Sequence, residues 1–319
     1  MKLNFINGAE LPLAELQKII DTALSYKRTN KLPRYDGKIL TLLFANPSLR
    51  TLLSFESGMK KMRGSVNTLQ LAGSWQFEYK NGAVMNEGTQ EHIKEAAAVI
   101  SRYSDVIGLR NSQLITTTQT HKGVFEWEYL KKDEALTQLA CYSTKPIINM
   151  ESNMYHPCQS LADMMTIQER LVEQKKKKYV LTWVPHVKAL PLATPHSQFL
   201  TPSIFGMDVT LVMPNGFPLD EDVIKLAKKR SFEVGGSITI THDQEEAFKD
   251  ADVIVAKSWA SLKYFGDWNA ESKYRSQFSN WMVDEKKMRS TNNAIFLHCL
   301  PLRRNVEVSD AVLDSSYSK

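Results

Sequence analysis

The sequence lacks several features that would assign it to a common class of protein. Its 319 residues include only three cysteines, Cys141, Cys158 and Cys299, without CxxC spacing. So sparse and odd a set argues against a disulfide framework and a structural zinc site, and it fits a reducing cytoplasm. No apolar run approaches the roughly 20 residues that span a bilayer, and the first five residues lack the apolar core of a signal peptide.

Nucleotide- and metal-binding signatures are missing as well. The sequence contains no GxGxxG or GxxxxGK[ST] loop after a strand-like segment, no HExxH and no paired-carboxylate motif, so we expect neither cofactor nor metal ion. The formal charge of +5 is mild, and the one dense basic run, Lys175–Lys178, precedes a strand-like segment as a solvated loop would. A nucleic-acid interface would need a concentrated basic stripe with aromatic residues. We therefore expect small anionic partners, and neither nucleic acid nor membrane.

Strand-like apolar segments alternate with amphipathic segments along the chain. Strands are expected at residues 39–44, 66–69, 105–109, 146–149, 179–183, 209–213, 237–241, 253–256 and 294–298. Helices are expected at residues 15–28, 51–62, 91–103, 134–142, 161–172, 220–230 and 244–248. Strands this apolar are typical of parallel sheets covered by helices on both faces. The sequence therefore predicts an α/β protein with two doubly wound parallel-sheet domains joined by helices, residues 1–150 and 151–319.

The segment Ser48–Thr51 joins the first expected strand to a helix. Two hydroxyls and the Arg50 guanidinium therefore lie at a helix N-terminus, where free N–H groups and the helix dipole attract anions. Arg50 can add a bidentate contact to phosphate or carboxylate. An ordinary N-cap beside a surface arginine would use the same residues, so both interpretations stay open.

Other strand ends carry polar residues too, and ligands bind at such ends in this class of fold. His156 precedes Pro157, which suits the first turn of a helix, and Gln159 follows. A histidine donor and a glutamine amide can orient a carbonyl and an amide group. A satisfied, partly buried histidine is the alternative. In the segment His298–Pro301, a nucleophilic Cys299 would need an orienting third group, and none is evident.

Together these motifs resemble those of the transcarbamylase family. Ser48-x-Arg50-Thr51, His156-Pro157-x-Gln159-x-x-Ala162-Asp163 and His298-Cys299-Leu300-Pro301 match in order and spacing over nearly the whole chain. Within the family the chain looks most similar to the N-acetylornithine carbamoyltransferases, with the N-succinylornithine enzymes as near relatives. The resemblance implies carbamoyl transfer from carbamoyl phosphate to the δ-amine of an N-acylornithine in arginine biosynthesis, without metal, cofactor or covalent intermediate.

The resemblance also implies the roles of individual residues. Carbamoyl phosphate would be bound by Ser48, Leu49, Arg50, Thr51, Trp75, Leu300 and Arg303, and its carbamoyl group held by Arg110, His156, Gln159 and Cys299. Acylornithine would be bound by Glu151, Lys257 and Gln90. Trp75, which follows Gly73 and Ser74, matches a residue that the family extends into a neighbouring subunit, so a homotrimer with shared sites is implied. A core tryptophan is the alternative.

Two of these positions concern the acceptor. Ordinary ornithine transcarbamylases carry Asp, which suits a free α-ammonium, where this chain has Lys257. A cation would repel ornithine and accept an acylornithine with its neutral amide and bare carboxylate, whereas a solvated lysine is the alternative. At Gln90 the acetyl relatives carry Glu and the succinyl relatives Pro. Overall motif similarity favours N-acetylornithine, and N-succinylornithine stays the alternative.

The sequence departs from the family pattern at two places. Glu307 stands where acetyl relatives have a lysine that can be carboxylated, so it would supply a similar charge without modification. The family continues past the position of Lys319 into a helix that packs on the first domain, which leaves open where the last segment of this chain lies. Two other functions compete: a catalytically silent regulatory paralogue, disfavoured by the intact site residues, and a nicotinamide dehydrogenase, disfavoured by the missing glycine fingerprint.

Overall fold

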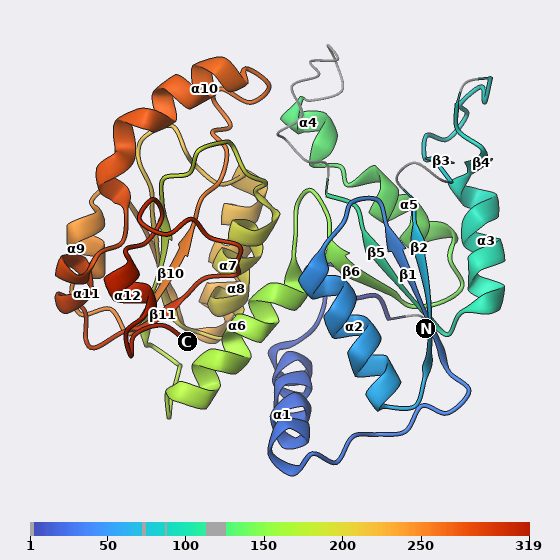
Figure 1. Cartoon of the computed structure of the whole chain (residues 1–319), viewed down its shortest axis with the longest axis horizontal. Coiled ribbons are helices and arrows are strands. Elements are labelled where there is room, and N and C mark those ends of the chain that lie inside the picture. Colours follow the sequence, from blue (N-terminus) through green and yellow to red (C-terminus); the bar gives the residue numbers. More distant parts are fainter. Residues whose placement is uncertain (1–2, 72–74, 87, 113–125) are drawn as a thin grey trace.

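The computed structural model describes residues 3–71, 75–86, 88–112 and 126–319, and two parallel sheets lie side by side in it (Figure 1). The first has the strand order β2 (Ser65–Gln70), β1 (Ile39–Phe44), β5 (Val106–Arg110), β6 (Ile147–Glu151). The second has the order β11 (Ile295–Leu297), β10 (Val253–Lys257), β7 (Lys178–Trp183), β8 (Asp208–Val212), β9 (Ser237–Thr241). All these pairings are parallel, which confirms the predicted fold class.

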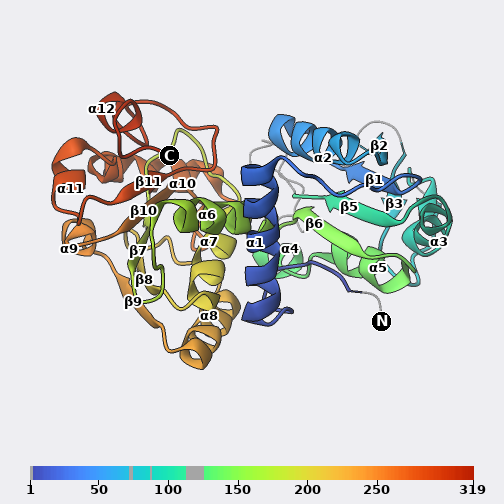
Figure 2. The same ribbon diagram turned by 90° about the horizontal axis from the view of Figure 1, so that it is seen from below.

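Helices cover both faces of the first sheet because β1 is apolar on both sides. Leu42 and Phe44 pack toward Phe55 of α2 (Leu49–Lys61), whereas Leu43 faces the opposite core. That opposite core is formed by α3 (Ile93–Tyr103) and α5 (Glu134–Tyr142), as Figure 2 shows. Burying each such side chain contributes about 1.5–3 kcal/mol. Two short strands, β3 (Phe77–Glu78) and β4 (Glu91–His92), and the short helix α4 (Trp127–Leu130) complete this half.

The second sheet has α7 (Ala193–Ile204) and α8 (Glu221–Val234) on the side toward the first half, and α9 (Gln244–Phe248) and α11 (Glu285–Arg289) on the other (Figure 2). Three further short helices are α10 (Trp268–Arg275), η1 (Ser276–Trp281) and α12 (Asp310–Leu313). The sequence did not predict α7. All its side chains are buried, so its residues show no amphipathic period, and Pro195 and Pro202 disfavour a helix.

Two helices join the halves. α6 (Pro157–Arg170) leads from the first sheet to the second, and α1 (Leu13–Thr29) packs on it. Leu16 and Ile20 of α1 share a buried core with Ile167 of α6, so the first helix of the chain lies between the halves (Figure 2). The last residues pair with β11: Phe296 N donates to Tyr317 O at 2.8 Å, and Lys319 N donates to Phe296 O at 3.1 Å. This end of the chain therefore extends the second sheet.

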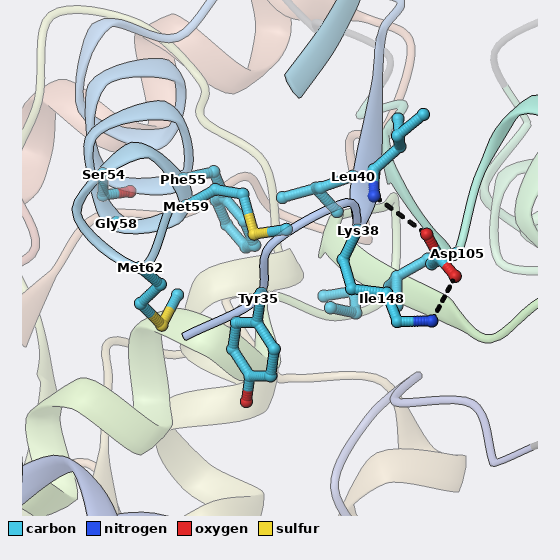
Figure 3. Close-up of a pocket in the computed structure, with 12 residues that line it drawn as sticks. Tyr35, Lys38, Leu40, Ser54, Phe55, Gly58, Met59, Met62, Asp105 and Ile148 are labelled. Carbon is cyan, nitrogen blue, oxygen red and sulfur yellow. Dashed lines mark hydrogen bonds and ion pairs between the residues drawn. The ribbon is translucent and has the colours of Figure 1, made fainter. Parts of the chain in front are cut away.

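A cavity of about 720 Å³ opens where α2 covers the amino ends of β1, β5 and β6. Figure 3 shows its apolar lining, including Phe55, Met59 and Ile148. Its charged groups satisfy one another, because Lys38 Nζ lies 3.0 Å from Asp105 Oδ1. The chemistry-bearing residues lie at the other ends of these strands, so this cavity is not the candidate active site. Among the described residues, no helix has the length and apolar character needed to cross a membrane.

Candidate active site

Charges from both halves act on the same side chains near the carboxyl ends of the strands. Burial lowers the pKa of His298, which follows β11, to about 3, and Lys257, His186 and Arg50 add to this shift. Arg50 belongs to the first half and Lys257 to the second. The predicted site residues at these strand ends are therefore brought together from distant parts of the sequence.

The N-terminus of α2 forms one wall of this region. Ser48 is its N-cap: Thr51 N donates to Ser48 Oγ at 3.4 Å, and Ser48 Oγ donates to Thr51 Oγ1 at 2.9 Å. Leu49 and Arg50 are exposed, and the first turn of α2 carries no acidic residue. The N-cap interpretation is therefore confirmed. The anion site stays a prediction that fits this helix end, because the cap leaves the exposed Arg50 beside the positive end of the helix dipole.

A register shift brings Arg110 opposite Glu151. Leu109 pairs with Asn149 but Arg110 pairs with Glu151, so β6 contains one extra residue at this point. The two side chains form an ion pair, and Glu151 Oε2 also lies 3.7 Å from His156 Nε2. Such bulges redirect side chains at the ends of strands.

His156 is held by its backbone and leaves part of its ring without a partner. Its N–H donates to Ser197 Oγ of α7 at 2.8 Å, while Nδ1 is buried and unbonded among the described residues. Burial, the largest cause, lowers the pKa of His156 to about 4. The ring is therefore neutral at physiological pH, and the alternative of a satisfied structural histidine is wrong.

Gln159 is linked to residues that the sequence analysis did not assign. Its Nε2 donates to Asp163 Oδ1 at 2.8 Å, and Gln198 Nε2 donates to Asp163 Oδ2 at 2.8 Å. Gln198 and Ser197 lie on the unpredicted helix α7. A run of polar residues within a mostly apolar segment was the one sequence signal that marked them.

Lys257 ends β10 and is only 8% exposed, so the alternative of a solvated surface lysine is wrong. The loop that follows it is fixed by Arg275, which donates to Ser258 Oγ at 2.7 Å and to Trp259 O at 2.8 Å. Arg275 is itself buried in an ion pair with Glu271. The sequence does not mark this pair, because α10 is largely polar and only tertiary packing buries Glu271 and Arg275.

The segment after β11 adds further polar groups. Arg303 Nε donates to His186 Nε2 at 3.3 Å, and Arg303 N donates to Glu307 Oε2 at 2.6 Å. Glu307 is fully buried, and its Oε1 has no hydrogen-bond partner among the described residues. Burial raises the pKa of Glu307, while Lys257, Arg303 and Arg275 oppose the rise. A carboxyl group thus lies within a cluster of cations.

Cys299 lies in the same segment but is not activated as a nucleophile. Burial raises the pKa of its thiol, and Lys257 opposes this only in part. A protonated thiol is a poor nucleophile, so the pKa argues against covalent catalysis. The three cysteines are free, and no group of three or more His, Cys, Asp or Glu side chains in the described ranges could hold a metal ion.

Trp75 and Gln90 do not join the other site residues within one chain. Trp75 shortly precedes β3 and Gln90 directly precedes β4, and these two strands lie at the edge of the first half that is remote from the second (Figure 1). Trp75 is 49% exposed, so the core-tryptophan alternative is wrong, and its Nε1 donates to Glu91 Oε2 at 3.0 Å. Gln90 Oε1 accepts a hydrogen bond from Gln76 N at 2.7 Å. Their neighbours Gly73, Ser74 and Glu87 lie outside the described residues.

Comparison with known proteins gives consistent matches over both halves. Residues 4–169 match the profile of the aspartate/ornithine carbamoyltransferase carbamoyl-P binding domain, and residues 193–319 match its Asp/Orn binding domain. An N-acetylornithine carbamoyltransferase of Xanthomonas axonopodis pv. citri is 40% identical over 98% of this chain and 89% of that protein. An N-succinylornithine carbamoyltransferase of Bacteroides fragilis is 34% identical over 88% of this chain and 81% of that protein.

The fold agrees with these matches. The crystal structure of an acetylornithine transcarbamylase complexed with acetylcitrulline is similar with a TM-score of 0.93 and 40% identity. The similarity covers 99% of this chain and 93% of that one. This chain belongs to the aspartate/ornithine carbamoyltransferase family.

Proposed function

We propose that this chain transfers the carbamoyl group of carbamoyl phosphate to the δ-amine of N-acetyl-L-ornithine, giving N-acetyl-L-citrulline and phosphate in arginine biosynthesis. The observation that carries the proposal is the convergence of Arg50 and Lys257, from different halves, on His298. In this proposal, Arg50 belongs to the phosphate site and Lys257 binds the acceptor carboxylate, and both lie near His298. The acetylornithine enzymes at 40% identity support this choice of acceptor.

Residues 1–150 supply the phosphate part of the donor site, and both halves supply its carbamoyl part. The phosphate is held at the N-terminus of α2, where the charge of the leaving group develops, by Ser48, Leu49, Arg50 and Thr51. Arg110 and neutral His156 donate to the carbamoyl oxygen, and Gln159 contacts the carbamoyl amine. Donors already in place when charge builds on that oxygen lower the barrier, and holding two substrates in register supplies much of the rest. The other side of the donor site is lined by Cys299, Leu300 and Arg303.

Residues 151–319 supply most of the acceptor site. The buried Lys257 pairs with the α-carboxylate of the acylornithine, whose α-nitrogen is a neutral amide and needs no anionic partner. Glu151, at the end of β6, contacts the acceptor from the first sheet. When ionised, Glu307 supplies a negative charge near Lys257 and Arg303, which limits the repulsion between these two cations. N-succinylornithine is the second candidate acceptor, because Gln90 lacks the charge that would exclude a succinyl carboxylate.

The working enzyme in this proposal is a homotrimer in which Trp75 reaches the site of a neighbouring copy. Support comes from the exposure of Trp75 and from the place of the strand that it precedes, β3, which lies at the edge of the first half away from the second (Figure 1). Gln90 lies in the same segment and would enter the neighbouring copy's site together with Trp75. The free cysteines fit a cytoplasmic location.

Formation of ureido product from carbamoyl phosphate tests the function. Ornithine, N-acetylornithine and N-succinylornithine are compared as acceptors at equal concentration. We expect the highest kcat/KM with N-acetylornithine and little turnover of ornithine. Binding of carbamoyl phosphate without turnover of any acceptor would indicate the silent paralogue, and preference for ornithine would contradict the role of Lys257.

A further inference from the structure

The carboxylate of Asp163 accepts a hydrogen bond at each oxygen from a side-chain amide. Gln159, one turn earlier on α6, donates to Oδ1, and Gln198 of α7 donates to Oδ2, both at 2.8 Å. An ionised carboxylate can only accept hydrogen bonds. Each amide must therefore turn its NH2 group toward Asp163, so the carbonyl oxygen of Gln159 points away from it.

We propose that Asp163 and Gln198 are positioning residues that fix the Gln159 amide with its carbonyl oxygen toward the amino group of carbamoyl phosphate. The inference rests on the proposed function, which brings that amino group to Gln159. The amino group donates hydrogen bonds and needs an acceptor. A reversed Gln159 amide would oppose two donors and lose the contact. Asp163 thereby makes the site selective for a carbamoyl group over an acyl group of similar shape.

The surroundings of Asp163 keep this arrangement fixed. Asp163 is 9% exposed and Gln198 only 1%, and Tyr179 Oη donates to Gln198 O at 2.8 Å, which anchors this turn of α7 to the second sheet. Burial raises the pKa of Asp163 to about 6, so the group stays mainly ionised at neutral pH and above. A buried carboxylate is costly compared with an apolar side chain. Its presence beside Gln159 therefore indicates a role beyond packing.

Acetyl phosphate provides the test, because it replaces the amino group of carbamoyl phosphate by a methyl group. Dissociation constants for both ligands are measured by calorimetry on the full chain and on Asp163→Asn. The asparagine side chain offers one acceptor and one donor, so one of the two glutamine amides must reverse. Partly exposed Gln159 reverses more easily than buried Gln198. We expect carbamoyl phosphate to bind about three- to tenfold more weakly, the effect of one hydrogen bond, and acetyl phosphate to be unaffected.

Asp163→Leu, which offers no hydrogen-bond acceptor, is the second variant and is used if Asp163→Asn does not fold. It should lose the same selectivity for carbamoyl phosphate over acetyl phosphate. Glu169→Gln makes the matched carboxylate-to-amide change at an exposed position on the same helix and should leave both constants unchanged. Equal weakening of both ligands by the Asp163 variants, or no change in either, would overturn the inference. Failure of the unaltered chain to bind carbamoyl phosphate would instead overturn the proposed function, and this inference with it.

Discussion

His156 Nε2 lies 3.7 Å from Glu151 Oε2, and the same carboxylate forms an ion pair with Arg110. Burial lowers the pKa of His156 to about 4; Glu151 opposes this shift, and Arg110 and Lys257 add to it. The ring is therefore neutral at physiological pH and can donate one N–H to a carbonyl oxygen. A carbamoyl oxygen that gains negative charge during attack would find Arg110 and this N–H already in place.

The first prediction concerns the titration of His156. Because its folded-state pKa is lowered, the ring stays neutral as pH falls from about 8 to about 6, where an ordinary histidine would take up a proton. The Cε1–H chemical shift of His156, assigned with His156→Asn, should be flat over this range. Glu151→Gln removes the group that raises the pKa, so the midpoint should move lower still. A midpoint near the ordinary value of 6.5 would contradict the burial argument.

The second prediction concerns the phosphate contact of Arg50. Arg50→Ala removes a charge-assisted contact at an exposed helix N-terminus and should weaken carbamoyl phosphate binding by about 2 kcal/mol or more. Calorimetry measures the change in dissociation constant. Lys61→Ala removes a cation from the opposite end of α2 and should have no comparable effect. An unchanged constant for Arg50→Ala would count against the phosphate assignment.

The strand end before Arg50 and the strand end at Lys257 were predictable, because β1 and β10 are mainly apolar runs bounded by polar residues. The same pattern located α2 and the polar residues at its start within two positions. The hydrophobic pattern locates these elements because each passes from buried to exposed surroundings, either from one face to the other or at its end. Motif spacing then linked them to a family, which physical patterns alone did not achieve.

The unpredicted part of the site depends on tertiary contacts. Gln198 lies on a helix buried on every side, so no period marks it, and its partner Asp163 is 35 positions away in the sequence. The pairing of Arg110 with Glu151 depends on a one-residue bulge that local sequence does not indicate. Arg275 is buried against Glu271, the loop after Lys257 and the Trp183 ring, which come from separate parts of the sequence. Such contacts join residues that are distant in the sequence, so they cannot be predicted until the fold is known.

The third prediction concerns acceptor choice at Lys257. Lys257→Met keeps the length of the side chain but removes its charge, so the KM for N-acetylornithine should rise about tenfold or more. The dissociation constant of carbamoyl phosphate should change far less. Steady-state kinetics with both acylornithines and with ornithine measures the effect. Lys263→Met, in the exposed loop beyond the site, is the control, and equal loss in the two variants would contradict the role of Lys257.

The fourth prediction concerns Gln90. Gln90→Glu adds a negative charge without changing the size of the side chain, and this charge should repel the extra carboxylate of N-succinylornithine by about 1 kcal/mol. The kcat/KM for N-succinylornithine should therefore fall about fivefold relative to that for N-acetylornithine. Gln138→Glu adds the same charge on α5 and should leave the ratio unaltered. The ratio of the two kcat/KM values is the readout. An unaltered ratio for Gln90→Glu would mean that residue 90 does not face the acyl group.

The last prediction tests the shared site. In the proposed trimer, Arg50 and Trp75 at any one site come from different copies, so Arg50→Ala and Trp75→Ala each impair every site of a homotrimer. Dissociating and reassembling the two variants together creates some sites with both side chains intact, and carbamoyl transfer should exceed that of either variant alone. Arg50→Ala mixed with Arg110→Ala should regain nothing, because both residues belong to the same copy. Absence of recovery in the first mixture, with hybrids verified by mass, would show that Trp75 does not complete a neighbouring site.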